Sequence, residues 1–193
     1  MIFGDIDKSK FSGDLRCHDV VDELFWSLKL DDIKLNGISL GLCDDKECIV
    51  TPDSGTSFST MPTWAMEDAE KMLPLKRDCV SDHKFGTLTY TIDGVDYDIS
   101  SSHFMERFRD EEGTYICEFT IAELDIMQEG QENLFILGDA FMQLYYSVFD
   151  RDTDQVCFGK AVHKIAQQNY LITENGMEES LYSQKPQVAG SVF

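Results

Sequence analysis

The segment IVTPDSGTS, residues 49–57, joins an apolar, strand-like run to a polar turn. Asp53 stands where the run ends, and a carboxylate at a strand end needs nearby hydroxyl and backbone N–H groups to orient it. Gly55 lets the backbone turn tightly, and Ser54 and Thr56 carry hydroxyl groups. Because Asp and Gly are also common turn residues, the segment indicates a function only together with the sequence around it.

Short apolar runs separated by turn residues make up much of the remaining sequence. Residues 87–92 and 95–99 alternate in polarity around Asp93-Gly94, which is the strongest short-range signal of a β-hairpin. Further strands are expected at residues 25–30 and 33–37 (joined by a turn at Asp31-Asp32), 49–52, 135–138, 145–149 and 156–159. Many short strands and one clear helix predict a mainly β domain.

The one clear helix is expected to run from about Pro62 to Leu73. Proline suits the first position of a helix, and Pro74 would stop the helix at its other end. The apolar side chains of this segment fall at spacings that let them share one buried face. We expect that face to contain Trp64, Met66 and Met72.

The chain carries a large negative charge. Among its 193 residues, 16 Lys and Arg face 36 Asp and Glu, which gives a formal net charge of −20. A field of this sign repels phosphate groups, so we expect no nucleic-acid partner. The charge fits a solubilising surface, or adaptation to an acidic compartment in which many of the carboxylates would be protonated.

The length fits one domain, which we place at residues 1–163. Residues 164–193 are polar and are expected to form a weakly ordered extension. No apolar stretch approaches the roughly 18 residues that span a bilayer, so no membrane span is expected. The first residues lack the basic end and apolar run of a signal peptide, so the targeting segment of a secreted parent would lie upstream.

Metal ions and cofactors are not expected. The histidines are scattered and the cysteines are not spaced as zinc ligands. The acidic run Asp150–Asp154 imitates the start of a calcium loop, but Gln155 and Ala161 stand where that loop needs a glycine and an acidic ligand. We therefore interpret this run as an acidic turn between two strands.

Several segments give the turn at Asp53 its context. From about residue 3 to residue 162, the order of features resembles the carboxy-terminal lobe of the pepsin-like aspartic endopeptidases. The matching segments are FGDID at 3–7, FSGDL at 11–15, FW at 25–26, DSGTS at 53–57, TIDG at 91–94, ILGD at 136–139 and YYSVFDR at 145–151. The resemblance implies one lobe of the bilobal acid-protease fold, mainly β, with one or two short helices.

The resemblance also implies roles for individual residues. Asp53 would be one of the two catalytic aspartates of an aspartic endopeptidase, supported by Ser54, Gly55 and Thr56. The segment from Ile136 to Gly138 should pass beneath this turn. The candidate walls of the substrate pocket are Thr51, Thr60 and Ile136.

A second Asp-Thr/Ser-Gly turn and a flap tyrosine are absent from the sequence, and in the family both belong to the amino-terminal lobe. We therefore expect this chain to supply one aspartate and half of the substrate cleft, and to be inactive unless an amino-terminal lobe pairs with it. The expected partners are that lobe and a peptide or protein substrate. Two alternatives stay open: a non-catalytic lobe that binds a peptide or a partner, and a retroviral-like homodimer.

One departure from the family pattern lies next to the proposed catalytic residue. Pro52 stands directly before Asp53, where the family usually has an aliphatic residue. Proline removes a backbone donor from the strand, which raises the question of altered pairing there. Ser54 replaces the more frequent threonine but keeps a hydroxyl group.

The six cysteines suggest disulfides, although their connectivity does not follow from sequence alone. Cys43 and Cys48 bracket a turn-like acidic segment, which favours a small local bridge. The resemblance implies this bridge and a longer one, Cys79–Cys117. Cys17 and Cys157 fall outside the common family pattern, and they either pair or stay as buried thiols. Disulfides indicate the secretory pathway, with a lysosomal, vacuolar or extracellular destination.

Overall fold

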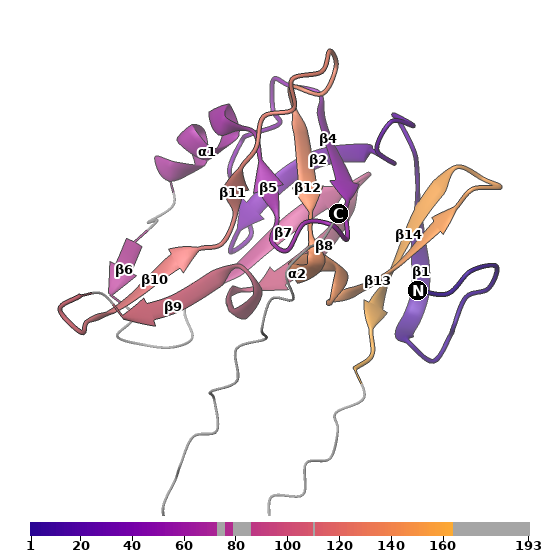
Figure 1. Ribbon diagram of the computed structural model, residues 1–193. Helices are drawn as coiled ribbons and strands as arrows, with labels where there is room; N and C mark the ends of the chain where they lie inside the picture. Colours follow the sequence, from indigo (N-terminus) through magenta and orange to yellow (C-terminus); the bar gives the residue numbers. More distant parts are fainter. Residues whose placement is uncertain (73–75, 79–85, 110, 164–193) are drawn as a thin grey trace, which may run out of the picture. The chain divides into compact units, whose positions relative to one another are not determined.

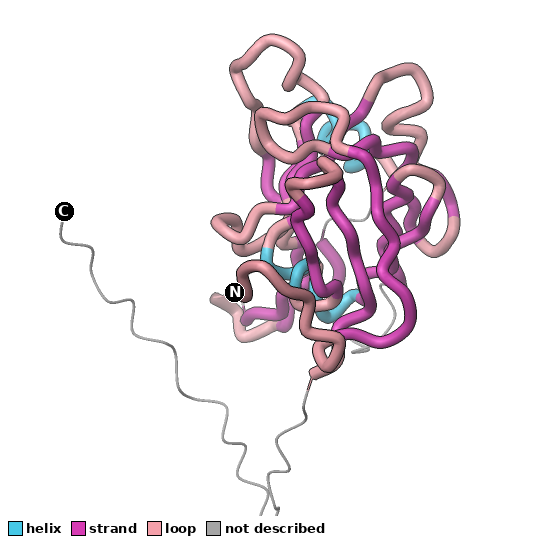
Figure 2. Tube along the Cα trace, turned by 90° about the vertical axis from the view of Figure 1, so that its right-hand side faces the viewer, coloured by secondary structure: helices cyan, strands magenta, loops and turns pink. Residues whose placement is uncertain are grey.

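Strands dominate the computed structural model (Figure 1), and the few helices set among them are short (Figure 2). This is the mainly β architecture expected of a single pepsin-like lobe. The described residues are 1–72, 76–78, 86–109 and 111–163. The proposed extension at 164–193 lies outside them, so the domain boundary at 163 stays a prediction.

The elements follow one another along the chain with strands in the majority. The strands are β1 (Phe11–Asp19), β2 (Leu28–Leu35), β3 (Ile38–Ser39), β4 (Cys48–Pro52), β5 (Thr60–Met61), β6 (Lys76–Asp78), β7 (Thr87–Ile92), β8 (Val95–Ser100), β9 (Met105–Arg109), β10 (Tyr115–Phe119), β11 (Ala122–Glu123), β12 (Leu134–Leu137), β13 (Tyr145–Asp150) and β14 (Gln155–Ala161). The helices are α1 (Thr63–Glu70), the 3-10 helix η1 (Ser101–His103) and α2 (Asp139–Met142).

The largest sheet places residues 49–52 in its interior. Its strands lie in the order β11-β5-β12-β4-β2-β7-β8, and β3 also pairs with β2. β12 runs parallel to β4, and their register sets Leu137 opposite Pro52. Val50 and Phe135 on these two strands are 0% exposed. Central strands that are covered on both faces carry runs of apolar residues, and the sequence of β12, LFIL, fits that position.

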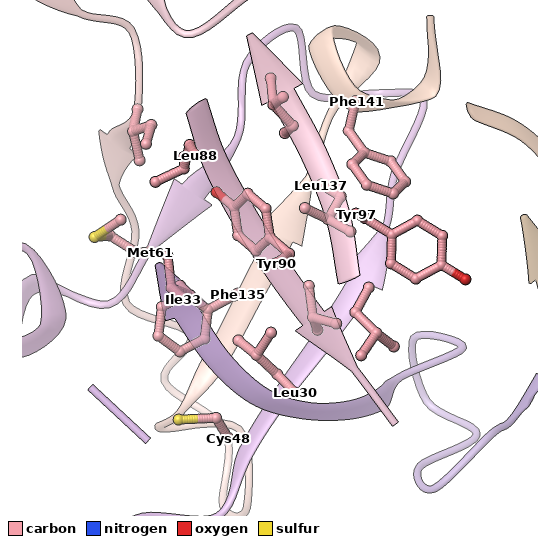
Figure 3. Close-up of a cluster of buried hydrophobic side chains, with 14 of the residues drawn as sticks. Leu30, Ile33, Cys48, Met61, Leu88, Tyr90, Tyr97, Phe135, Leu137 and Phe141 are labelled. Carbon is pink, nitrogen blue, oxygen red and sulfur yellow. The ribbon is translucent and has the colours of Figure 1, made fainter. Parts of the chain in front are cut away.

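The hydrophobic core gathers side chains from this sheet, from helix α1 and from β14. Figure 3 shows part of it, with Tyr90 and Phe135 among the largest fully buried side chains. Burial raises the pKa of the Tyr90 hydroxyl to about 12, and a hydrogen bond with Ser59 partly opposes this effect. Complete burial of one large apolar side chain contributes about 1.5–3 kcal/mol, so this cluster is the main source of stability.

The other strands of the described residues form two smaller sheets, with the strand orders β1-β14-β13 and β6-β10-β9. In the first, Cys17 lies directly opposite Cys157, and a disulfide joins them. This resolves the choice that the sequence left open. Cys43 and Cys48 form a second disulfide. Cys79 lies outside the described residues, so the Cys79–Cys117 bridge stays a prediction.

The predicted hairpin at Asp93-Gly94 is confirmed, since β7 and β8 pair along their whole length around these two residues. Both have positive φ, 46° for Asp93 and 75° for Gly94, as the favoured two-residue hairpin turn requires. The second predicted pair is also confirmed, with β13 and β14 antiparallel from Tyr145 to Asp150.

The turn predicted at Asp31-Asp32 is wrong, because β2 runs straight through both residues. The strand accommodates them with a register shift in its pairing with β7. Both carboxylates also find donors: Asp31 accepts the N–H of Gly94 at 2.6 Å, and Asp32 accepts the hydroxyl of Ser39 at 2.7 Å. Turn-forming residues can therefore remain in a strand whose neighbours satisfy their side chains.

The same strand begins later than predicted. Phe25 and Trp26 lie in a turn before β2, and Trp26 has a φ of 55°, which a strand does not contain. Two backbone hydrogen bonds close this turn, from Ser27 N–H to Asp22 O at 3.0 Å and from Val21 N–H to Ser27 O at 2.8 Å. As a result, the last residues of β4 have no β2 partner.

Helix α1 is shorter than predicted. It begins at Thr63, with Pro62 as its N-cap residue, and ends at Glu70. Met66 is buried and Trp64 is half-buried, as expected for one face of the helix. Met72 is 49% exposed, so its predicted place in the buried stripe is wrong. The reason is that the helix has already ended before this residue.

Candidate active site

Asp53 follows β4 directly, and its own turn holds its side chain. The N–H of Gly55 donates to Oδ1 at 2.9 Å, and the hydroxyl of Thr56 donates to Oδ2 at 2.7 Å. Asp53 is half-buried, whereas Ser54 and Gly55 are exposed. Each carboxylate oxygen therefore has one local donor that fixes its direction, and the group still reaches solvent.

The residues that follow β12 also hold the turn in place. The N–H groups of Asp139 and Ala140, at the start of α2, donate to Thr56 O at 2.8 Å and to Ser57 O at 3.1 Å. Gly138 lies so close that a Cβ there would overlap the carbonyl oxygens of Thr56 and Phe58. The segment from Ile136 to Gly138 thus packs against the turn, and only glycine allows this approach.

Pro52 does not disturb the pairing of its strand. The N–H of Asp53 donates to Leu137 O at 3.0 Å, so the ladder between β4 and β12 continues past the proline. Backbone groups alternate in direction along a strand, so the nitrogen of Pro52 points to the β2 side. The β2–β4 pairing has already ended there, at Leu28 and Val50. The missing N–H therefore removes no ladder hydrogen bond.

The three predicted pocket residues lie side by side. Ile136 on β12 stands opposite Thr51 on β4 and opposite Thr60 on β5. All three are buried, with exposures of 4% for Thr51, 7% for Thr60 and 8% for Ile136. The hydroxyl of Thr51 donates to the carbonyl of Phe25, whereas Thr60 Oγ1 has no hydrogen-bond partner among the described residues. They form a row directly behind the turn, and their role in a pocket stays a prediction.

The backbone donors of this site were not identified from the sequence. The amides of Asp139 and Ala140 bind the turn, and no side-chain motif marks a backbone donor. Within the described part of the chain, no group of three or more His, Cys, Asp or Glu side chains is arranged to hold a metal ion. In the same part of the chain, no helix is both long enough and apolar enough to cross a bilayer.

Comparison with known proteins gives a consistent result. Residues 1–161 match the family model of the eukaryotic aspartyl proteases. The chain is 32% identical to Pepsin A of Bos taurus over 164 residues, which are 81% of this chain and 42% of the bovine protein. It is 32% identical to Cathepsin E-B of Xenopus laevis over 163 residues, 81% of this chain and 39% of that protein. Gastricsin of Mus musculus is 28% identical over 170 residues, 84% of this chain and 42% of the mouse protein.

These matches agree with the geometry around Asp53. This chain spans between 39% and 42% of the length of these relatives. The family model nevertheless covers nearly all of the described residues, including the turn at Asp53, the row behind it and the start of α2. The resemblance seen in the sequence is therefore confirmed, and the chain belongs to the eukaryotic aspartyl protease family.

Proposed function

We propose that this chain supplies the carboxy-terminal half of an aspartic endopeptidase, with Asp53 as one of its two catalytic carboxylates. The observation that carries the proposal is the hydrogen bonding and partial exposure of the Asp53 side chain. Both of its oxygens accept hydrogen bonds from the turn, through Gly55 and Thr56, while the group remains partly exposed. A carboxylate that is oriented and still reachable by water suits proton transfer.

The proposed reaction is hydrolysis of a peptide bond by a water molecule held between two carboxylates. One carboxylate accepts a proton from the water while the water oxygen attacks the carbonyl carbon. The other carboxyl group protonates the carbonyl oxygen. Two carboxyl groups so close together share one proton, because both cannot ionise easily. Asp53 provides one of them, and an amino-terminal lobe provides the other. The chain alone is therefore inactive.

The substrate is a peptide or protein segment that lies across the turn. Thr51, Thr60 and Ile136 are the proposed walls of its pocket, and their row directly behind the turn supports this role. Two disulfides among the described residues support an oxidising compartment. We place the protein in the secretory pathway, with a lysosomal, vacuolar or extracellular destination.

The test is reconstitution of a two-lobe protein. The 193-residue chain is refolded alone and together with the amino-terminal lobe of a pepsin-like relative, and cleavage of an unfolded protein is measured at acidic pH. We expect no cleavage by the chain alone, and pepstatin-sensitive cleavage by the pair. Asp53→Asn should lower the rate about 10²–10⁴-fold, while Asp14→Asn, an exposed carboxylate on β1, should leave it unchanged.

Other results would identify the alternative roles. A well-folded pair that cleaves nothing would contradict the proposal. If that pair still bound peptides after Asp53→Asn, a non-catalytic binding lobe would be favoured. Cleavage by the chain alone, together with a dimer mass in solution, would instead indicate a homodimer in which two copies of the same turn face each other.

A further inference from the structure

His18 on β1 is a buried histidine. Its side chain is 2% exposed, and it lies where the β1-β14-β13 sheet contacts β8 of the large sheet. Nε2 shares a hydrogen bond of 2.6 Å with the hydroxyl of Tyr97 on β8. Its ring also lies 5.7 Å from the Tyr97 ring and 6.0 Å from the Phe158 ring of β14. One titratable side chain thus connects two sheets.

The surroundings of His18 form an aromatic cluster. The ring of Tyr97 lies 5.3 Å from Phe158, 5.1 Å from Tyr145 on β13 and 6.0 Å from Phe141 on α2. Figure 3 shows Tyr97 and Phe141 near each other within the core. The hydroxyl of Tyr145 donates to Asp98 O on β8 at 2.9 Å. The junction between the sheets is therefore apolar and closely packed, which disfavours a charge inside it.

The second ring nitrogen of His18 has no hydrogen-bond partner among the described residues. The nearest carboxylate oxygen, Asp93 Oδ2 in the β7–β8 turn, is 3.7 Å from Nδ1, which is longer than a hydrogen bond. In the neutral tautomer whose Nε2–H donates to the Tyr97 hydroxyl, Nδ1 keeps a lone pair and carries no proton. Protonation would place an N–H on Nδ1 whose nearest acceptor, Asp93 Oδ2, lies beyond hydrogen-bond distance, and it would place a positive charge in the apolar junction.

Burial lowers the pKa of His18, and the carboxylates around it raise this pKa. Asp93, Asp19 and Asp31 favour the protonated ring, but Asp93 is 62% exposed, so water weakens its attraction. Lys29 is bound to Asp31 at 2.6 Å, which offsets that carboxylate. Other titratable groups near this junction, among the described residues, are Arg16 on β1, Tyr97 and Asp98 on β8, Tyr145 on β13 and Lys160 on β14. Burial prevails, and the pKa of His18 lies below its ordinary value of 6.5.

We propose that His18 is an acid-sensitive latch: the neutral imidazole holds the β1-β14-β13 sheet to β8 through Tyr97, and protonation loosens this attachment. Cys17, the preceding residue, is bonded to Cys157, so acid cannot release β1 from β14. The contact that weakens is the one between the three-stranded sheet and β8. This inference does not depend on the proposed proteolytic function.

The direction of the pH effect follows from the lowered pKa. The folded chain binds a proton at His18 more weakly than the unfolded chain does, so acid favours unfolding. The stability that His18 contributes is complete above a pH of about 6.5 and is lost as the pH falls toward the lower pKa of the folded chain. Each unit by which burial lowers that pKa corresponds to an about tenfold change in the unfolding constant.

The test compares the 193-residue chain with His18→Gln in urea, at pH 7.5 and at pH 5, with the disulfides intact. Glutamine can keep a hydrogen bond to Tyr97 but does not titrate. The quantity compared is the unfolding constant of the unmodified chain divided by the unfolding constant of His18→Gln. This ratio should be larger at pH 5 than at pH 7.5, by up to about tenfold for each unit by which folding lowers the pKa of His18. His163→Gln, at an exposed histidine, controls for the loss of one imidazole. A ratio that stays constant or falls in acid would overturn the latch.

Direct titration keeps the proposal testable if His18→Gln does not fold. The His18 imidazole resonance is followed by NMR against pH in the folded chain and in the chain unfolded by urea. We expect a lower midpoint in the folded chain, and a still lower one in Asp93→Asn, which retains a residue suited to the positive φ of 46° at that position. An equal or higher midpoint in the folded chain would refute the proposal.

Discussion

Replacement of Gly138 by alanine tests the packing beneath the proposed active site. Gly138 has a φ of −81°, which alanine can adopt, so backbone strain is not the cause of the expected effect. The added Cβ would overlap the carbonyl oxygens of Thr56 and Phe58, and neither is the end of a flexible side chain. The turn and the start of α2 must therefore move away from each other.

The size of the loss follows from the contacts that this movement breaks. An overpacked site costs about 1–3 kcal/mol. The two backbone hydrogen bonds from Asp139 and Ala140 to the turn contribute about 0.5–1.5 kcal/mol each. We expect Gly138→Ala to lower the free energy of unfolding by about 2–6 kcal/mol, as measured by urea denaturation followed by circular dichroism.

The matched control is Gly130→Ala. Gly130 has a φ of 83°, and no atom lies within 4 Å of the point that an added Cβ would occupy, so alanine there causes backbone strain of about 1–2 kcal/mol without overlap. If Gly138→Ala costs no more than Gly130→Ala, the close approach beneath the turn does not exist. In the reconstituted two-lobe protein, a folded Gly138→Ala should also lose activity, whereas Gly130→Ala should not.

The remaining predictions concern the disulfides and the turn. Loss of Cys17–Cys157, whose residues are 140 apart in the sequence, should lower the free energy of unfolding by about 4–5 kcal/mol in the chain-entropy model. Loss of Cys43–Cys48, with a separation of 5, should cost only about 2 kcal/mol, and equal losses in urea denaturation would contradict this reasoning. Thr56→Val removes the hydrogen bond to the Asp53 carboxylate, and hydrogen bonds to charged groups contribute about 1.5–3 kcal/mol, so kcat/KM of the proposed two-lobe protein should fall about ten- to hundredfold. Thr56→Ser keeps the hydroxyl and should retain most of the activity, and a loss as large as that of valine would argue against this bond.

Signals within a few residues predicted local structure well. The Asp93-Gly94 hairpin follows from two residues that tolerate positive φ between alternating strands. The predictions failed where distant residues compensate for a local preference. Asp31 remains in a strand because Gly94, far along the chain, donates to its carboxylate. The sequence around Asp31 contains no sign of that donor.

The sequence by itself determined the family, the mainly β class and the position of the carboxylate turn, since each depends on short segments in a recognisable order. Tertiary structure alone decided that Cys17 pairs with Cys157, that Gly138 packs against the turn, and that His18 is buried against Tyr97. The physical reason is that these contacts join residues distant in sequence. The residues in each pair become neighbours only after the sheets have formed, and local sequence propensities do not specify such long-range contacts.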